Sequence, residues 1–178
     1  MFDFSHVPPL AQTGDILEPH GIHAIIETPM GSRNKYNFNH EFGLFDFSRT
    51  LRAGMVWPCD FGFVPQTLAG DGDPLDVALL GEAPTFAGCL ARVRVIGAIG
   101  LVKNGEENNR ILAVPARSTK AASRFDEIMN ISAMNQRHIR EVEAFLSDYN
   151  TFEGHQIELT GWSDADAAWQ MVLDSIQK

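Results

Sequence analysis

Hydrophobic and polar positions alternate through the first two thirds of the chain, and this pattern predicts short β-strands. From Ile22 the segment IHAIIET is strand-like and stops at Pro29. Residues 35–47 alternate polar and aromatic side chains around a turn near residues 40–43, which is typical of a hairpin. The apolar runs VALL, LARVRVIGAIGLV and ILAVPA predict further strands.

Glycines and prolines refine this prediction. Gly97 and Gly100 indicate a bend in the long apolar run, as at the corner of a barrel. The segment MVWPCDFGFVPQT is aromatic but contains Pro58 and Pro65, so we expect a strand edge and a loop there. Residues 1–20 show no clear period, and an irregular N-terminal arm is expected.

The pattern changes near Ser123 to that of helices. Apolar residues at 139, 142, 145 and 146 fall on one helical face, and QIELTGW predicts one more strand. Ser163 precedes a final apolar-periodic segment, and Asp166 three residues on resembles a capping box. Strands first and helices later predict a mainly β, α+β fold, a small barrel or curled sheet with packed helices. With no repeat or linker, residues 1–178 are expected to form a single domain.

Composition limits the possible partners. The chain has 14 Lys and Arg against 23 Asp and Glu, a formal charge of −9, which argues against a nucleic-acid binder. No stretch approaches the roughly 18 apolar residues of a membrane span, and the N-terminus has no secretory pattern. Cys59 and Cys89 are expected to be reduced core thiols. We therefore expect a cytoplasmic protein that binds neither membranes nor nucleic acid.

The segment GDGDPLDVALL holds the most informative polar residues. Asp71, Asp73 and Asp76 lie within six residues and repel one another unless hydrogen bonds or cations neutralise them. A hard divalent ion such as Mg²⁺ suits such carboxylates. The alternative is a solvated Asp/Gly/Pro turn, but an aspartate that enters an apolar strand favours a site. An EF-hand fits poorly, because Leu75 and Asp76 stand where its loop needs an oxygen ligand and a glycine.

Other candidate residues carry weaker signals. His20 and His23 are expected at the surface. Trp57, Phe61 and Phe63 are expected in the core, where they could also form a wall of the site. No H-E-x-x-H, G-x-S-x-G, P-loop or G-x-G-x-x-G motif occurs, which excludes several hydrolase and nucleotide-binding folds.

The D-G-D-P-L-D run resembles the signature of the soluble family I inorganic pyrophosphatases. The similarity extends from about Ile25 to Trp162 and includes IIETP, Lys35-Tyr36, the aromatic segment before the acidic loop, and ILAVP. It implies a five-stranded OB-like barrel with helices packed outside. It also implies a homo-oligomer, often a hexamer in bacteria, and hydrolysis of pyrophosphate to two phosphates by a metal-activated water.

The resemblance also implies residue roles. Asp71 and Asp76 match metal ligands for Mg²⁺, with Mn²⁺ as an alternative, and Glu27 matches an acid that serves a substrate-side metal. Asp73 matches the catalytic acid that takes the proton from the attacking water. The positions expected to bind the small anionic substrate are Lys35, Arg49, Tyr149, Lys103 and Arg110.

Several positions depart from the family pattern. Lys103, Asn108 and Arg110 stand where the family has two metal-binding aspartates and a lysine. The remaining departures are Asn37 for an acid, Asn150 for a lysine, and Trp57 and Phe61 for tyrosines. The charge changes make the site three units more positive, so we expect one or two metal ions near the acidic loop. Glu106 and Glu107, which could replace the lost acids, are expected to be solvated instead.

Three hypotheses follow from these residues. The first is a pyrophosphatase that works with fewer metals. The second is a hydrolase of another phosphate-bearing or anionic small molecule, and the third is a non-catalytic binding protein on the same barrel. Because burying unused carboxylates together costs stability, the retained acids argue against the third.

Overall fold

The computed structural model describes residues 3–11, 19–117 and 122–177. It contains nine strands, two α-helices and one short 3-10 helix within these residues. In chain order they are β1 (Gly21–Thr28), β2 (Asn34–Asn39), β3 (Leu44–Thr50), β4 (Asp60–Phe63), β5 (Asp76–Leu79), β6 (Leu90–Lys103), β7 (Glu106–Glu107), β8 (Arg110–Pro115), η1 (Ile131–Ala133), α1 (Gln136–Phe152), β9 (Ile157–Ser163) and α2 (Ala165–Ser175).

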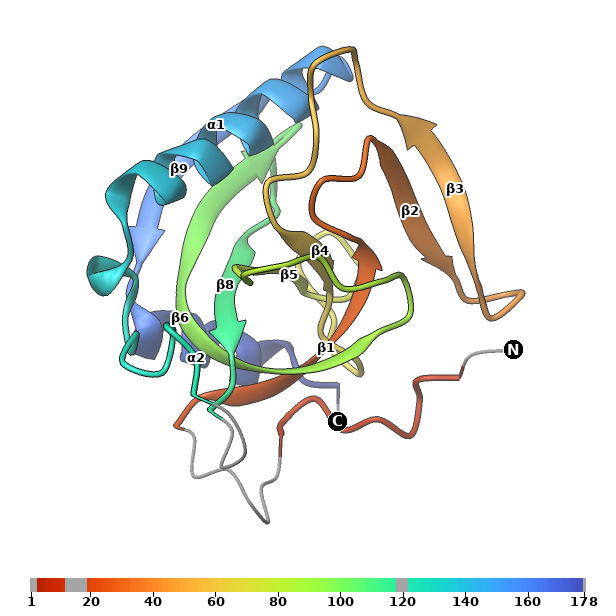
Figure 1. The fold of residues 1–178 in the computed structure, drawn as a ribbon. Helices are drawn as coiled ribbons and strands as arrows, with labels where there is room; N and C mark the ends of the chain where they lie inside the picture. Colours follow the sequence, from red (N-terminus) through yellow and green to blue (C-terminus); the bar gives the residue numbers. More distant parts are fainter. Residues whose placement is uncertain (1–2, 12–18, 118–121, 178) are drawn as a thin grey trace.

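Five strands close into a barrel (Figure 1). β1 pairs with β4, β4 with β5, β5 with β8, and β8 with β6, which returns to pair with β1. Every pair in this ring is antiparallel except β5 with β8, which is parallel. The predicted five-stranded OB-like barrel and α+β class are therefore confirmed.

The long strand β6 takes part in several pairings because it bends. Its register shifts between Val95 and Gly97 against β8, and between Gly100 and Leu101 against β9. A Cβ atom at Gly97 would lie 2.7 Å from the carbonyl oxygen of Ser163, and one at Gly100 would lie 2.2 Å from the Thr160 hydroxyl. The glycines thus allow β9 to pack closely, and the predicted bend is confirmed.

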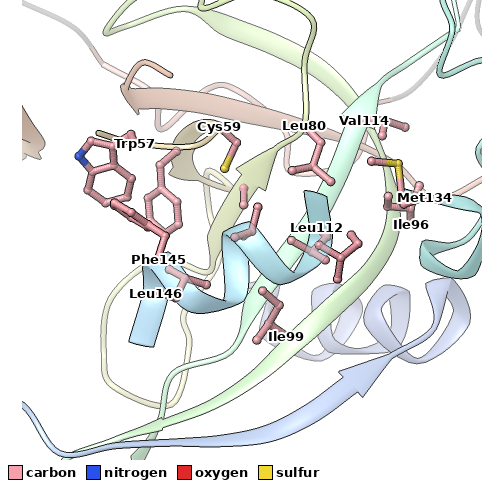
Figure 2. Close-up of a cluster of buried hydrophobic side chains, with 14 of the residues drawn as sticks. Trp57, Cys59, Leu80, Ile96, Ile99, Leu112, Val114, Met134, Phe145 and Leu146 are labelled. Carbon is pink, nitrogen blue, oxygen red and sulfur yellow. The ribbon is translucent and has the colours of Figure 1, made fainter. Parts of the chain in front are cut away.

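Two apolar clusters stabilise the barrel, because its strands are buried on both faces. Along β5 and the residue that follows it, Ala78 and Leu80 belong to one cluster, and Val77 and Leu79 to the other. The predicted apolar face of α1 packs into the first cluster, and Figure 2 shows Phe145 and Leu146 there beside Trp57. α2 covers the second cluster through Ala168 and Val172.

The helices begin at side-chain caps. Asn135 precedes α1 and its side chain accepts a hydrogen bond from the backbone N–H of Arg137 at 2.9 Å. The cap of α2 is Asp164, which accepts from the N–H of Ala167 at 2.9 Å. The predicted cap at Ser163 is therefore wrong by one residue, because Ser163 still belongs to β9.

Two other predictions were wrong. β4 lies in the middle of the barrel, paired on both sides, and not at an edge. Its prolines at 58 and 65 flank the strand, so no strand hydrogen bond is lost. His23, which was expected at the surface, is buried. Its Nδ1 lies 2.7 Å from the carbonyl oxygen of Pro8, so this ring nitrogen has a polar partner.

Peripheral segments complete the fold. β2 and β3 form the predicted hairpin, which stands beside the barrel as a separate sheet (Figure 1). Of the expected irregular arm, residues 3–11 contain no helix or strand and form a single isolated bridge, from Leu10 to Ile22, while residues 12–18 lie outside the described residues. Cys59 is buried and Cys89 half-buried, both as free thiols. Neither α1 nor α2 has the length and apolar content needed to cross a membrane.

Candidate active site

A cavity of about 290 Å³ lies between the barrel, the β2–β3 hairpin and α1. All nine site residues predicted from the sequence line it, although they come from seven elements and one loop. They are Glu27 on β1, Lys35 on β2, Arg49 on β3, Asp71 and Asp73 in the loop, Asp76 on β5, Lys103 on β6, Arg110 on β8 and Tyr149 on α1.

The acidic loop is anchored at both ends. The backbone N–H of Ala69 donates to the carbonyl oxygen of Asp73 at 2.7 Å, and the N–H of Asp73 reaches Asp71 Oδ1 at 3.2 Å. Beyond the turn, the N–H of Leu75 donates to the buried Thr67 hydroxyl at 2.9 Å. The segment is thus a turn, as in the alternative of a solvated Asp/Gly/Pro turn. Its carboxylates nevertheless line a cavity.

Asp76 forms an ion pair with Arg110. Arg110 Nη1 lies 2.7 Å from Asp76 Oδ2, and the guanidinium lies 5.7 Å from the centre of the Phe61 ring. Burial raises the pKa of the Asp76 carboxyl, while Arg110 and then Lys35 lower it. Asn108, two residues before β8, donates from its side-chain amide to Asp71 Oδ2, so both outer aspartates contact the segment that leads into β8.

Glu27 lies deeper in the cavity wall. It accepts a hydrogen bond from the backbone N–H of Phe38 at 2.6 Å. Burial raises the pKa of its carboxyl to about 7, although the hydrogen bond opposes this rise. Burial also lowers the pKa of the neighbouring Lys35. Burial thus shifts both pKa values toward the uncharged forms of the acid and the lysine.

The Glu27→Gln variant should stabilise the metal-free protein at high pH. The Glu27 pKa is raised from 4.5 to about 7 on folding, so its stability contribution is fully present below pH 4.5 and is lost as the pH rises through 7. Glutamine stays neutral and can still accept from Phe38. In urea denaturation with EDTA, we expect the variant to exceed the wild type by about 2 to 3 kcal/mol above pH 7, and by little near pH 4.5. An equal difference at both pH values would contradict this.

The opposite wall combines cations and aromatic rings. Lys35 Nζ lies 5.9 Å from the centre of the Tyr149 ring, which packs on Trp57 with centroids 5.4 Å apart. Arg49 forms an ion pair with Glu153. The expectation that the aromatic segment walls the site agrees with the structure, since Trp57, Phe61 and Phe63 line the cavity and are buried.

Sequence reasoning missed three ionisable residues in or beside this cavity. Glu153, the partner of Arg49, lies four residues after Tyr149, and that helical spacing was the available signal. His40 and His155 also line the cavity. They come from the hairpin turn and from the segment after α1, so neither has a spacing that links it to the acidic loop.

Acidic and basic side chains line the cavity in equal number. Four carboxylates (Glu27, Asp71, Asp73 and Asp76) face four cations (Lys35, Arg49, Lys103 and Arg110). In the described residues, no group of three or more Asp, Glu, His or Cys side chains is arranged as a ready metal site. Mg²⁺ is commonly held by only one or two carboxylates together with waters and substrate phosphates, so the donor set fits it. Carboxylates that suit a hard cation, beside basic side chains that suit phosphate, form the kind of site that metal-assisted phosphate hydrolases use.

Comparisons with known proteins give the family. The family model described as inorganic pyrophosphatase matches residues 24–178. The inorganic pyrophosphatase of Geobacillus stearothermophilus is 36% identical over 157 residues, covering 88% of this chain and 93% of that protein. That of a Synechocystis strain is 33% identical over 175 residues, covering 98% of each.

Solved structures agree. The crystal structure of inorganic pyrophosphatase from Thermus thermophilus superposes with a TM-score of 0.82 at 31% identity, covering 94% of this chain and 95% of that one. The enzyme from Neisseria gonorrhoeae gives a TM-score of 0.85 at 28% identity, covering 98% and 97%. The chain belongs to the inorganic pyrophosphatase family.

Proposed function

We propose that this chain hydrolyses inorganic pyrophosphate to two phosphates with the help of divalent metal ions. The observation that carries the proposal is the meeting of four carboxylates and four cations around one cavity, in a member of this family. The cations suit a polyanionic substrate, and the carboxylates suit the metal that accompanies it.

The proposed roles follow from position in the cavity. Asp71 and Asp76 hold the metal, with Glu27 serving a second ion, and Mg²⁺ is the proposed cation with Mn²⁺ as an alternative. A bound divalent ion supplies Lewis-acid stabilisation of phosphoryl charge and lowers the pKa of water. Asp73, exposed at the tip of the loop, accepts the proton from the attacking water.

The substrate is held by the cationic wall. Lys35 and Arg49 on the hairpin, with Lys103 and Arg110 on the barrel, bind the phosphoryl oxygens. Tyr149 adds a hydroxyl donor from α1. Holding both phosphoryl groups in line with the water is the main contribution that a protein makes to this kind of reaction.

A second candidate is a larger phosphate-bearing substrate. A neighbouring cavity of about 840 Å³ shares Phe38, His40, Phe63 and Pro74 with the first. Such a space beside the phosphate site could receive the organic part of a pyrophosphate ester. This cavity supports a ligand larger than pyrophosphate as the second candidate.

Phosphate release distinguishes the two functions. The wild-type protein is assayed with pyrophosphate and with a panel of phosphate monoesters and organic pyrophosphates, each with Mg²⁺, Mn²⁺ or EDTA. Release from pyrophosphate that requires added metal supports the first function. Release from an organic phosphate alone supports the second, and no release from any compound would contradict both.

We further propose that residues 1–178 form one domain that acts in the cytoplasm as a homo-oligomer, with a hexamer as the assembly suggested by the family resemblance. Free thiols at Cys59 and Cys89 suit a reducing compartment. Light scattering of the purified chain would give the assembly size, and a monomeric mass would contradict the oligomer.

A further inference from the structure

We propose that Arg110 blocks Asp76 against metal ions until an anion draws the guanidinium away, so that anion and metal bind cooperatively. This inference rests on the proposed function for the location of the two ligands. It adds an order to their binding, set by a contact within the chain. The contact involves four residues, which we call the clasp: Asp71, Asp76, Asn108 and Arg110.

The clasp is a continuous chain of polar contacts. Arg110 Nη1 lies 2.7 Å from Asp76 Oδ2 and donates to the carbonyl oxygen of Asn108 at 2.7 Å. Arg110 Nη2 donates to the side-chain oxygen of Asn108, whose amide in turn donates to Asp71. Asn108, just before β8, and Arg110, its first residue, thus hold one carboxylate at each end of the acidic loop.

This arrangement competes with metal binding. A carboxylate oxygen that accepts from a guanidinium has fewer lone pairs for a cation, and the fixed positive charge repels a divalent ion. Both Asp76 and Arg110 are largely buried, so solvent screens this repulsion weakly. Without an anion, the site therefore binds a divalent ion with lower affinity than its carboxylates would have without Arg110.

The clasp also leaves one donor unsatisfied. Arg110 Nε is buried and has no hydrogen-bond partner, although the side chain is only 9% exposed. A buried donor without a partner is unfavourable, and a phosphoryl oxygen in the cavity can satisfy it. A bound anion therefore favours a movement of the Arg110 guanidinium away from Asp76. That movement frees the Asp76 carboxylate to bind metal.

Thermodynamic linkage makes this coupling reciprocal. If an anion raises the affinity of the site for metal by a given factor, metal raises the affinity for the anion by the same factor. The coupling can be measured with inorganic phosphate and Mn²⁺, neither of which requires turnover. The matched variants are Arg110→Gln, which opens the clasp, and Arg49→Gln, which removes one charge from the same cavity but leaves the clasp intact.

Each protein is titrated with Mn²⁺ in a calorimeter, once without and once with phosphate. This gives two Mn²⁺ affinities for each protein, and their ratio is the coupling. In the wild type, we expect phosphate to tighten Mn²⁺ binding by about tenfold. In Arg110→Gln, Mn²⁺ should already bind about tenfold tighter without phosphate, and phosphate should add little. Arg49→Gln should bind phosphate more weakly, because Arg49 is a proposed phosphoryl contact, but it should change the Mn²⁺ affinity without phosphate only slightly. At a phosphate concentration that saturates this variant, it should keep the coupling of about tenfold.

Two further variants guard against a folding defect. Arg110→Lys keeps the charge and should keep the weak Mn²⁺ binding, while Asn108→Ala keeps every charge but loosens the guanidinium and should tighten Mn²⁺ binding partly. Arg110→Gln that binds Mn²⁺ no tighter than Arg49→Gln, or that keeps the full phosphate coupling, would overturn the proposal. Should Arg110→Gln fail to fold, unchanged Mn²⁺ affinity in Asn108→Ala would overturn it instead.

The same data separate this proposal from the proposed function. A protein that shows the coupling but releases no phosphate from pyrophosphate keeps the clasp and loses the proposed function. A protein that hydrolyses pyrophosphate but shows no difference between Arg110→Gln and Arg49→Gln keeps the function and loses the clasp.

Discussion

The Asp73→Asn variant is expected to lose turnover by about 10² or more, while its affinity for Mn²⁺ stays within a few-fold of the wild type. Asp73 lies between the two proposed metal ligands, and its carboxylate is exposed to the cavity. Asparagine keeps the size of the side chain but cannot accept a proton from water. Steady-state phosphate release and calorimetry on the same preparation measure the two effects.

The control for this prediction is Glu106→Gln, which removes an exposed acid that does not line the cavity. It should leave turnover and metal affinity unchanged. Parallel loss of Mn²⁺ binding and turnover in Asp73→Asn would place Asp73 among the metal ligands. Retained turnover would mean that another group accepts the proton.

The Asp76→Ala variant should have the second large effect, a loss of metal binding. With phosphate present, the wild type should show at most about two tight sites, and the variant should lose at least one of them. We expect the affinity to fall by more than the roughly 10- to 100-fold typical of a change outside the ligand set. Turnover should fall with it, because metal and substrate are held together.

The same substitution tests the ion pair with Arg110. Removing Asp76 leaves a buried guanidinium without its carboxylate, so the variant should also be less stable in urea. The double variant Asp76→Ala with Arg110→Met should recover part of that stability but none of the metal binding. Unchanged Mn²⁺ binding in Asp76→Ala would contradict the proposed ligand role.

Much of the fold could be predicted from local patterns. The apolar face of α1 and the bend at Gly97 and Gly100 each follow from the periodicity or backbone freedom of neighbouring residues. The position of β4 could not be predicted, because two flanking prolines resemble an interruption until the strand partners are known. His23 was missed for a similar reason, since its partner, the carbonyl oxygen of Pro8, lies 15 residues away in the N-terminal arm.

For the candidate site, the residues could be predicted from the sequence, but the contacts between them could not. The motif around Asp71 and the family resemblance identified residues that the fold does bring to one cavity. The contact of Arg110 with Asp76 depends on parallel pairing between β5 and β8, which no local pattern encodes. The same holds for the pair of Arg49 and Glu153, which lie 104 residues apart. Motif and resemblance thus predicted nine residues that line the cavity. Which acid pairs with which cation became visible only in the tertiary structure.

Hydrolysis in water enriched in ¹⁸O, followed by phosphorus NMR, is the most direct test of pyrophosphate cleavage by this chain. With Mg²⁺ present, we expect the pyrophosphate signal to be replaced by phosphate. At early times, one of the two phosphates from each pyrophosphate should carry one ¹⁸O atom, because water attacks a single phosphorus atom. A pyrophosphate signal that stays unchanged with folded protein and Mg²⁺, or phosphate that contains no ¹⁸O, would contradict the proposed reaction.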